Sequence, residues 1–176
     1  MVLCGPGGVG KGTIASRLVR EVNNLTLSRS WTTRRRRRGE SSDSYVFVTR
    51  AEFEEAIAQD QFFEWAEFLG NLYGTPKPDP EMATDLLLEI DIQGARQVRE
   101  RDPGAEIILI VAPSSDDLRH RMEFRGDDVT SIDERVEIGQ EEIAEASEFA
   151  DFVVVNDDLN RAVLEISTII SSLRSA

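Results

Sequence analysis

The stretch VLCGPGGVGKGTIASRLV, residues 2–19, decides the fold of this chain. Its first three residues are apolar and predict a short buried strand, and the apolar spacing in residues 13–22 predicts a helix. Between the two, glycines let the backbone curl so that its N–H groups point inward, and the start of the helix adds partial positive charge. A strand, a glycine-rich loop and a helix in this order predict a phosphate-binding loop (P-loop).

The predicted P-loop departs from the usual pattern directly after its lysine. Lys11 is expected to reach the β- and γ-phosphates of a nucleoside triphosphate. The next residue is usually a Ser or Thr whose hydroxyl contacts magnesium, but in this chain Gly12 follows the lysine and Thr13 comes one position later. The direct ligands of magnesium therefore stay unknown. The residues expected to bind the nucleotide are Gly5, Pro6, Gly7, Gly8, Val9, Gly10, Lys11, Gly12 and Thr13.

Apolar runs alternate with segments of helical spacing along the rest of the chain. Residues 85–91, 106–112 and 152–155 predict strands whose continuous apolar character suits a parallel sheet buried on both faces. The predicted helices span residues 50–59, 93–101, 114–124, 131–147 and 158–173. Capping boxes are expected at Thr49 with Glu52 and at Ser131 with Glu134. This repetition predicts an α/β doubly wound core with a parallel sheet flanked by helices.

Residues from about 30 to 80 interrupt the alternation. They contain most of the aromatic residues and only short strand-like pieces, which indicates an inserted small lobe. A length of 176 residues suits one domain. We therefore expect a single domain over residues 1–176, with a core of about 1–29 and 81–176 and a lobe of about 30–80.

The charge distribution limits the partners of this chain. The formal net charge is −13 even though five consecutive arginines, residues 34–38, are included in it. An acidic body repels nucleic acid and anionic membranes, so we expect neither as a partner, and the basic cluster indicates local anion binding. No apolar run is long enough for a bilayer and no secretory signal is present. The single cysteine, Cys4, is expected to be buried, and these features favour a cytoplasmic location.

Five strings, in order along the chain, resemble those of the guanylate kinase family. They are SRSWTTRRRRRGE (28–40), SYVFV (44–48), FFEWAEFLGNLYGT (62–75), LLEIDIQGA (87–95) and VVVNDDL (153–159). The resemblance covers essentially the whole chain. It implies a P-loop kinase core, a GMP-binding lobe and a helical lid of about residues 121–136. It also implies a transferase of purine metabolism that moves the γ-phosphoryl group of ATP to GMP with Mg²⁺, giving ADP and GDP.

The resemblance places the guanine site in the inserted lobe. Glu64 matches the glutamate that accepts the two adjacent N–H groups of guanine, and the hydroxyls of Ser30 and Thr75 match the donors to O6 and N7. Such a site should reject adenine, because the carboxylate would meet an acceptor. Glu89 and Asp91 match paired acidic positions, and Asp91 would hold either guanine or a metal-bound water. A polar strand end is the alternative for Glu89.

The phosphate of GMP needs positive charge and hydroxyl donors. Arg34 and Arg37 fall on the family's arginine pair, whose planar guanidinium groups suit phosphate, and Tyr45 and Tyr73 supply phenols. The other three arginines of the run are expected to be solvated. GMP binding is thus assigned to Ser30, Arg34, Arg37, Tyr45, Glu64, Tyr73, Thr75, Glu89 and Asp91.

The resemblance also implies a mobile lid with arginines. Phosphoryl transfer requires in-line positioning and positive charge on the moving group, and lid arginines would supply that charge on closure. Lys11, Arg125 and Arg135 are the expected catalytic residues. Arg121 and Asn156 are expected at the ATP site. A surface salt bridge is the alternative for each of the lid arginines Arg121, Arg125 and Arg135, and a helix N-cap is the alternative for Asn156. His120, the sole histidine, is given no catalytic role.

Several positions depart from the family pattern. Gly7 stands where a serine is usual, and the segments 40–45 and 76–85 are shorter than typical. Two other functions are therefore considered. A peptide-binding module would have lost the P-loop lysine or the GMP contacts, which this chain retains. A nucleic-acid binder using the arginine run is disfavoured by the acidic body and by the lack of stacking aromatics within the run. The oligomeric state is not predicted.

Overall fold

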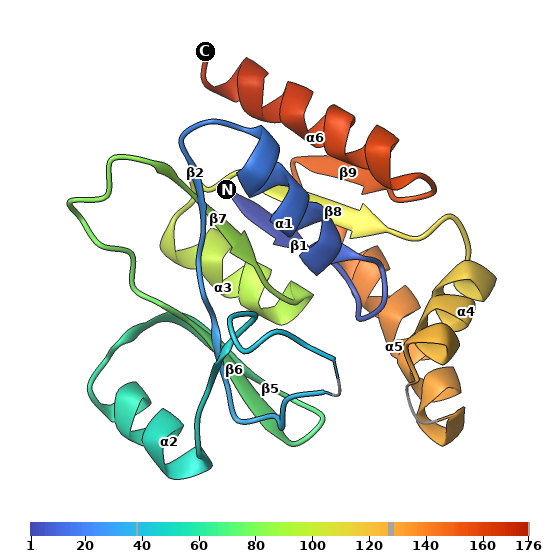
Figure 1. Ribbon diagram of the computed structural model, residues 1–176, viewed down its shortest axis with the longest axis horizontal. Coiled ribbons are helices and arrows are strands. Elements are labelled where there is room, and N and C mark those ends of the chain that lie inside the picture. Colours follow the sequence, from blue (N-terminus) through green and yellow to red (C-terminus); the bar gives the residue numbers. More distant parts are fainter. Residues whose placement is uncertain (38, 127–128, 176) are drawn as a thin grey trace.

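The computed structural model describes residues 1–37, 39–126 and 129–175, with the backbone alone at residues 125 and 129–131. The chain forms a core around one sheet and a smaller lobe around a second sheet (Figure 1). The core sheet has the order β2-β7-β1-β8-β9, and every pair in it is parallel. The predicted parallel α/β core is confirmed. Among the described residues, no helix has both the length and the apolar character to cross a membrane.

The strands of the core are short. They are β1 (Val2–Cys4), β2 (Leu25–Leu27), β7 (Asp85–Glu89), β8 (Ile107–Val111) and β9 (Phe152–Val155). Four of them coincide with apolar runs of the sequence. Strand β2 was not predicted, because three residues show no period by themselves and only pairing with β7 defines them as a strand.

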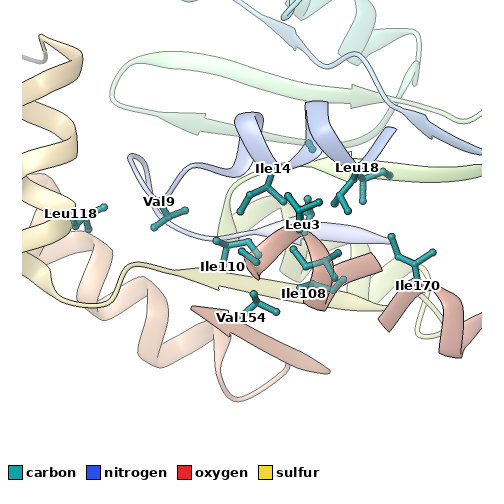
Figure 2. Packing of buried hydrophobic residues seen from close by; sticks show 14 of the residues in the cluster. Leu3, Val9, Ile14, Leu18, Ile108, Ile110, Leu118, Val154 and Ile170 are labelled. Atoms are coloured by element: carbon teal, nitrogen blue, oxygen red, sulfur yellow. The ribbon is translucent and has the colours of Figure 1, made fainter. Parts of the chain in front are cut away.

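Helices cover both faces of the core sheet (Figure 1). They are α1 (Lys11–Glu21), α3 (Ile92–Arg101), α4 (Ser115–Arg125), α5 (Val129–Ala146) and α6 (Leu159–Leu173). Because successive strand residues point to opposite faces, Leu3 packs with α1 and α6, whereas Val2 and Cys4 pack with α3. Figure 2 shows the first of these clusters, in which Ile14 and Leu18 of α1 meet Ile108 and Ile110 of β8. Cys4 is buried as predicted, and burial raises the pKa of its thiol to about 12.

The helix starts agree with the sequence at one predicted cap and not at the other. Thr49 and Glu52 form the expected capping box at the start of α2 (Arg50–Ala58). The cap predicted at Ser131 is wrong, because α5 already includes Val129 and therefore contains Ser131 within the helix. Asp91 instead caps α3, with its carboxylate accepting a hydrogen bond from the backbone of Gly94.

The smaller lobe has its own sheet and its own apolar cluster. Its strands are β3 (Trp31–Thr32), β4 (Val46–Phe47), β5 (Phe62–Phe68) and β6 (Asn71–Pro76), in the order β4-β3-β6-β5. Helix α2 covers this sheet through Phe53, whose ring stacks on Phe62 with 4.5 Å between centroids. The aromatic residues that distinguish this stretch of the sequence therefore build the core of the lobe.

Candidate active site

A cleft of about 720 Å³ lies between the core and the lobe. Its core side is formed by the P-loop and by the end of β7, both at the carboxyl ends of parallel strands, where ligands bind in open α/β sheets. Its other side belongs to the lobe. The predicted site residues that line it are Gly5, Gly7, Gly8, Gly10, Lys11, Gly12, Thr13, Ser30, Arg34, Arg37, Tyr45, Glu64, Tyr73, Glu89, Asp91, Arg121 and Arg135.

The P-loop joins β1 to α1 and has positive φ at three glycines, Gly5, Gly8 and Gly10. Gly8 has φ +97° and Gly10 has φ +96°, values that L side chains rarely adopt. A side chain is also excluded sterically, because a Cβ on Gly10 would lie 2.6 Å from Nδ2 of Asn156. Lys11 lies back over the loop, and its Nζ donates hydrogen bonds to the carbonyls of Gly5 and Pro6, the latter at 3.1 Å.

Two side chains outside the loop hold it from behind. Asn156, at the end of β9, donates from Nδ2 to the carbonyl of Val9 at 2.7 Å. Arg121 of α4 donates to the same carbonyl at 3.2 Å and to the carbonyl of Asn156 at 2.6 Å. Asn156 is buried and is absent from the described residues that line the cleft. Its alternative role as a helix N-cap is not observed, because Asp158 caps α6.

Three further predicted residues, Pro6, Val9 and Thr75, also lie outside the described lining of the cleft. Val9 is fully buried in the core cluster, so its side chain anchors the loop while its backbone remains part of it. Thr75 lies directly behind Ser30 and Glu64. Val9 and Thr75 therefore support neighbouring residues that face the cleft.

Residues of α5 approach the P-loop from the predicted lid. A Cβ placed on Gly7 would lie 2.8 Å from a guanidinium nitrogen of Arg135, so this arginine stands directly over the loop. Gly7, where a serine is usual, thereby leaves space for Arg135. The side chain of Arg125, predicted as catalytic, lies outside the described residues.

Glu142 is a cleft residue that the sequence analysis missed. It lines the cleft, and burial together with the charge of Asp91 raises the pKa of its carboxyl to about 6, against the opposing effect of Lys11. Its position seven residues after Arg135 puts both on one face of α5. That spacing was the one available signal in the sequence.

The end of the cleft that is predicted to bind guanine is a buried polar corner. Glu64 of β5 is 3 % exposed, and Thr75, opposite it on β6, is fully buried. The hydroxyl groups of Ser30 and Thr75 form a hydrogen bond of 3.2 Å. Burial raises the pKa of Glu64 to about 7; hydrogen bonds from the hydroxyl and backbone of Thr75 oppose the rise, and Asp91 adds to it. The corner thus presents the Glu64 carboxylate and the Ser30 hydroxyl to the cleft, and the Thr75 hydroxyl is buried against them.

The acidic pair at the end of β7 lies between the two ends of the cleft. Asp91 accepts the backbone N–H of Gly94 at 2.7 Å, so one of its oxygens is committed to the cap of α3. Glu89 lies beside the P-loop, since a Cβ on Gly12 would be 3.6 Å from its Oε2. Burial raises the pKa of Glu89, and the charge of Lys11 opposes the rise.

The part of the cleft that is predicted to bind the phosphate of GMP contains an arginine, Arg34, paired with a carboxylate. Glu40 pairs with both terminal nitrogens of Arg34, at 2.7 and 3.0 Å, and accepts the backbone N–H of Arg37 at 2.9 Å. Burial alone would raise the pKa of Glu40, but these hydrogen bonds hold it below its usual range. The Arg34 guanidinium also lies over the ring of Tyr45. Its position on the wall of the cleft lets it meet an anionic ligand.

Glu40 was also missed by the sequence analysis, although it stands at the end of the quoted arginine string. Arg35 and Arg36 are exposed, in agreement with the expectation of solvated arginines, and Arg38 lies outside the described residues. The cleft therefore has the P-loop with Lys11 at one end, and Arg34 next to a buried polar corner at the other.

Comparisons with known proteins agree on one family. A family profile described as guanylate kinase matches residues 1–173. The chain is 43 % identical to a guanylate kinase of Desulfitobacterium hafniense (97 % of this chain, 88 % of the relative) and 42 % identical to one of Syntrophomonas wolfei (98 % and 91 %). Among solved structures, it is similar to the guanylate kinase from Anaplasma phagocytophilum, with a TM-score of 0.79 and 33 % identity over 97 % of this chain and 83 % of that one.

Proposed function

This chain belongs to the guanylate kinase family, and we propose that the residues of its cleft carry out the family's reaction. The protein is an ATP:GMP phosphotransferase, which moves the γ-phosphoryl group of ATP to GMP and gives ADP and GDP. ATP would bind at the P-loop and GMP at the lobe, with the two nucleotides meeting above Lys11. We further propose a cytoplasmic enzyme whose acidic body excludes nucleic acid and membranes as partners.

The observation that carries this proposal is that the P-loop and Arg34 line one and the same cleft. Lys11 and the P-loop glycines form one candidate anion site, and Arg34 forms a second candidate site. Glu64, Ser30 and Thr75 lie beside that second site and match the donor and acceptor edges of guanine. Transfer between two bound phosphates needs positioning and charge neutralisation, which Lys11 and Arg135 would provide without forming a covalent bond to the protein.

Magnesium is proposed as the cofactor, held mainly by the nucleotide phosphates and by waters. No group of three or more His, Cys, Asp or Glu side chains is arranged to hold a metal within the described part of the chain. The residues beside the P-loop nevertheless fit a hard cation, because Glu89 places an oxygen near the position where the loop usually has a hydroxyl. Thr13 also lines this end of the cleft. When bound, the ion would neutralise phosphate charge.

A pair of variants tests the assignment of the two ends of the cleft. Lys11→Ala is expected to lower kcat at least ~100-fold while leaving the Kd for GMP, measured by calorimetry, within about twofold. Glu64→Gln is expected to raise the Kd for GMP about tenfold or more and to leave the Kd for ATP unchanged. If Lys11→Ala keeps near-normal turnover, or if Glu64→Gln weakens both nucleotides equally, the assigned roles are wrong.

A further inference from the structure

Helix α3 lies along the outer edge of strand β5. This strand ends the lobe sheet, so within the described residues no strand pairs with its outer backbone groups. Gln97 takes part of that place: its Nε2 donates to the carbonyl of Trp65 at 2.7 Å, and its Oε1 accepts the N–H of Trp65 at 3.4 Å. Arg101 donates to the carbonyl of Phe63. Two side chains of α3 are therefore hydrogen-bonded to the backbone of β5 on either side of Glu64.

These hydrogen bonds from α3 lie at an irregular point of strand β5. Phe62 is opposite Pro76 and Glu64 is opposite Thr75, so Phe63 is an extra residue on β5. A bulge of this kind changes the direction of the side chains that follow it. Arg101 contacts the carbonyl of the extra residue itself, and Phe63 also packs against the core cluster that contains α3. The direction of Glu64 is thus set where the lobe meets α3.

The carboxylate of Glu64 rests on the first turn of the same helix. A Cβ on Gly94 would lie 2.7 Å from Oε2 of Glu64 and 3.2 Å from its Cδ. The N–H of Gly94 is already bonded to Asp91. Any side chain at position 94 would therefore displace the carboxylate of Glu64 from this position.

We propose that Gly94, Gln97 and Arg101 form a template on α3 that positions Glu64, and that discrimination for guanine depends on this template. Their spacing of three and seven residues puts them on one face of the helix. None of the three is among the described residues that line the cleft, so they act through Glu64 and are positioning residues. The inference rests on the proposed role of Glu64 as the residue that accepts the N–H groups of guanine.

The first test compares GMP with IMP, which lacks the 2-amino group and so offers Glu64 one N–H fewer. Gln97→Met removes both hydrogen bonds to Trp65 at nearly constant length. The ratio of kcat/KM for GMP to that for IMP is expected to fall by roughly three- to tenfold, because two bonds weaken for GMP and one for IMP. The KM for ATP should stay constant. Gln140→Met, the same change at an exposed position of α5, is the matched control and should keep the parent ratio.

A second variant separates positioning from loss of structure. Gly94→Ala adds a methyl group against the end of Glu64, while alanine favours the helix more than glycine does. We expect the GMP to IMP ratio to fall as for Gln97→Met, with no decrease in Tm.

The outcomes separate the template from the assignment on which it rests. If Glu64→Gln lowers the ratio but Gln97→Met and Gly94→Ala do not, the template is wrong and the role of Glu64 stands. If Glu64→Gln itself leaves the ratio unchanged, both are wrong. A ratio that falls together with an equal rise in the KM for ATP would show general damage and would also overturn the template.

Discussion

Glu64 is subject to two opposing requirements. Burial disfavours its ionised form and raises its pKa to about 7, even though Thr75 stabilises the charge by hydrogen bonds. Guanine, in contrast, presents two adjacent donors, and both carboxylate oxygens must accept them. GMP should therefore select the ionised form and release a proton when it binds to the protonated enzyme.

The affinity for GMP is accordingly expected to depend on pH through Glu64. Protonation converts an acceptor into a donor, so binding should weaken as pH falls through about 7 and reach about a tenfold loss at pH 6 relative to the high-pH limit. Calorimetric titration of GMP between pH 6 and 8 measures this effect. The same titration with Glu64→Gln measures the part of the pH dependence that comes from ionisation of the GMP phosphate, since this variant lacks the carboxyl group. A parent and a variant with the same pH dependence would contradict the role of Glu64.

Some candidate site residues could be predicted from the sequence more easily than others. Glu64, Ser30 and Thr75 could be proposed because each lies in a long specific string, and the structure places Glu64 and Ser30 on the wall of the cleft. Glu40 and Glu142 could not, since a carboxylate in a charge-rich segment is usually solvated. Only the structure shows that Glu40 is bonded to Arg34 and that Glu142 lines the cleft.

At the scale of elements, the P-loop is held by parts of the chain that are distant in sequence. Its Val9 carbonyl accepts hydrogen bonds from Asn156 after β9 and from Arg121 of α4. Leu118 and Met122 of α4 would also meet a side chain placed on Gly8, at 3.1 Å each. The curled shape of the loop is thus stabilised from outside before a nucleotide binds.

Removing the side-chain amide of Asn156 should weaken the binding of ATP, because the P-loop loses a hydrogen bond that holds its shape. Asn156→Ala is expected to raise the KM for ATP roughly three- to tenfold, with the Kd for GMP unchanged. Because the contact is to the loop and not to the base, GTP tested as a donor should lose the same factor. Asn160→Ala, at the surface of α6, is the control. A loss specific to ATP would show instead that Asn156 contacts adenine directly.

Helices and strands with a clear pattern of apolar residues could be predicted from the sequence, whereas elements that depend on pairing with a distant part of the chain could not. The helices and the four apolar strands of the core agree with the sequence to within a few residues. Strand β2 depends on pairing with β7, and the start of α5 before Ser131 overrides a local capping signal. The contact of α3 with β5 was also not predictable, because it joins side chains of one part to backbone groups of another.

For the whole molecule, function depends on how the lobe faces the core. The sequence predicted an insertion near residues 30–80, and the described sheet of the lobe lies within that range, from Trp31 to Pro76. The cleft itself follows from topology, since the P-loop and the end of β7 meet at the carboxyl edge of one parallel sheet. The short segment at 40–45 lies within the lobe, between β3 and β4, and the short segment at 76–85 connects the lobe to β7 of the core.

We propose that one cleft transfers a phosphoryl group from ATP to GMP and selects guanine by buried polar groups. An ADP-release assay with ATP and magnesium, offering GMP, AMP, CMP and UMP in turn, is the decisive measurement. We expect strong turnover with GMP and at least ~100-fold lower kcat/KM with the other three acceptors. Comparable turnover with AMP, or no turnover with any acceptor by the folded protein, would contradict it.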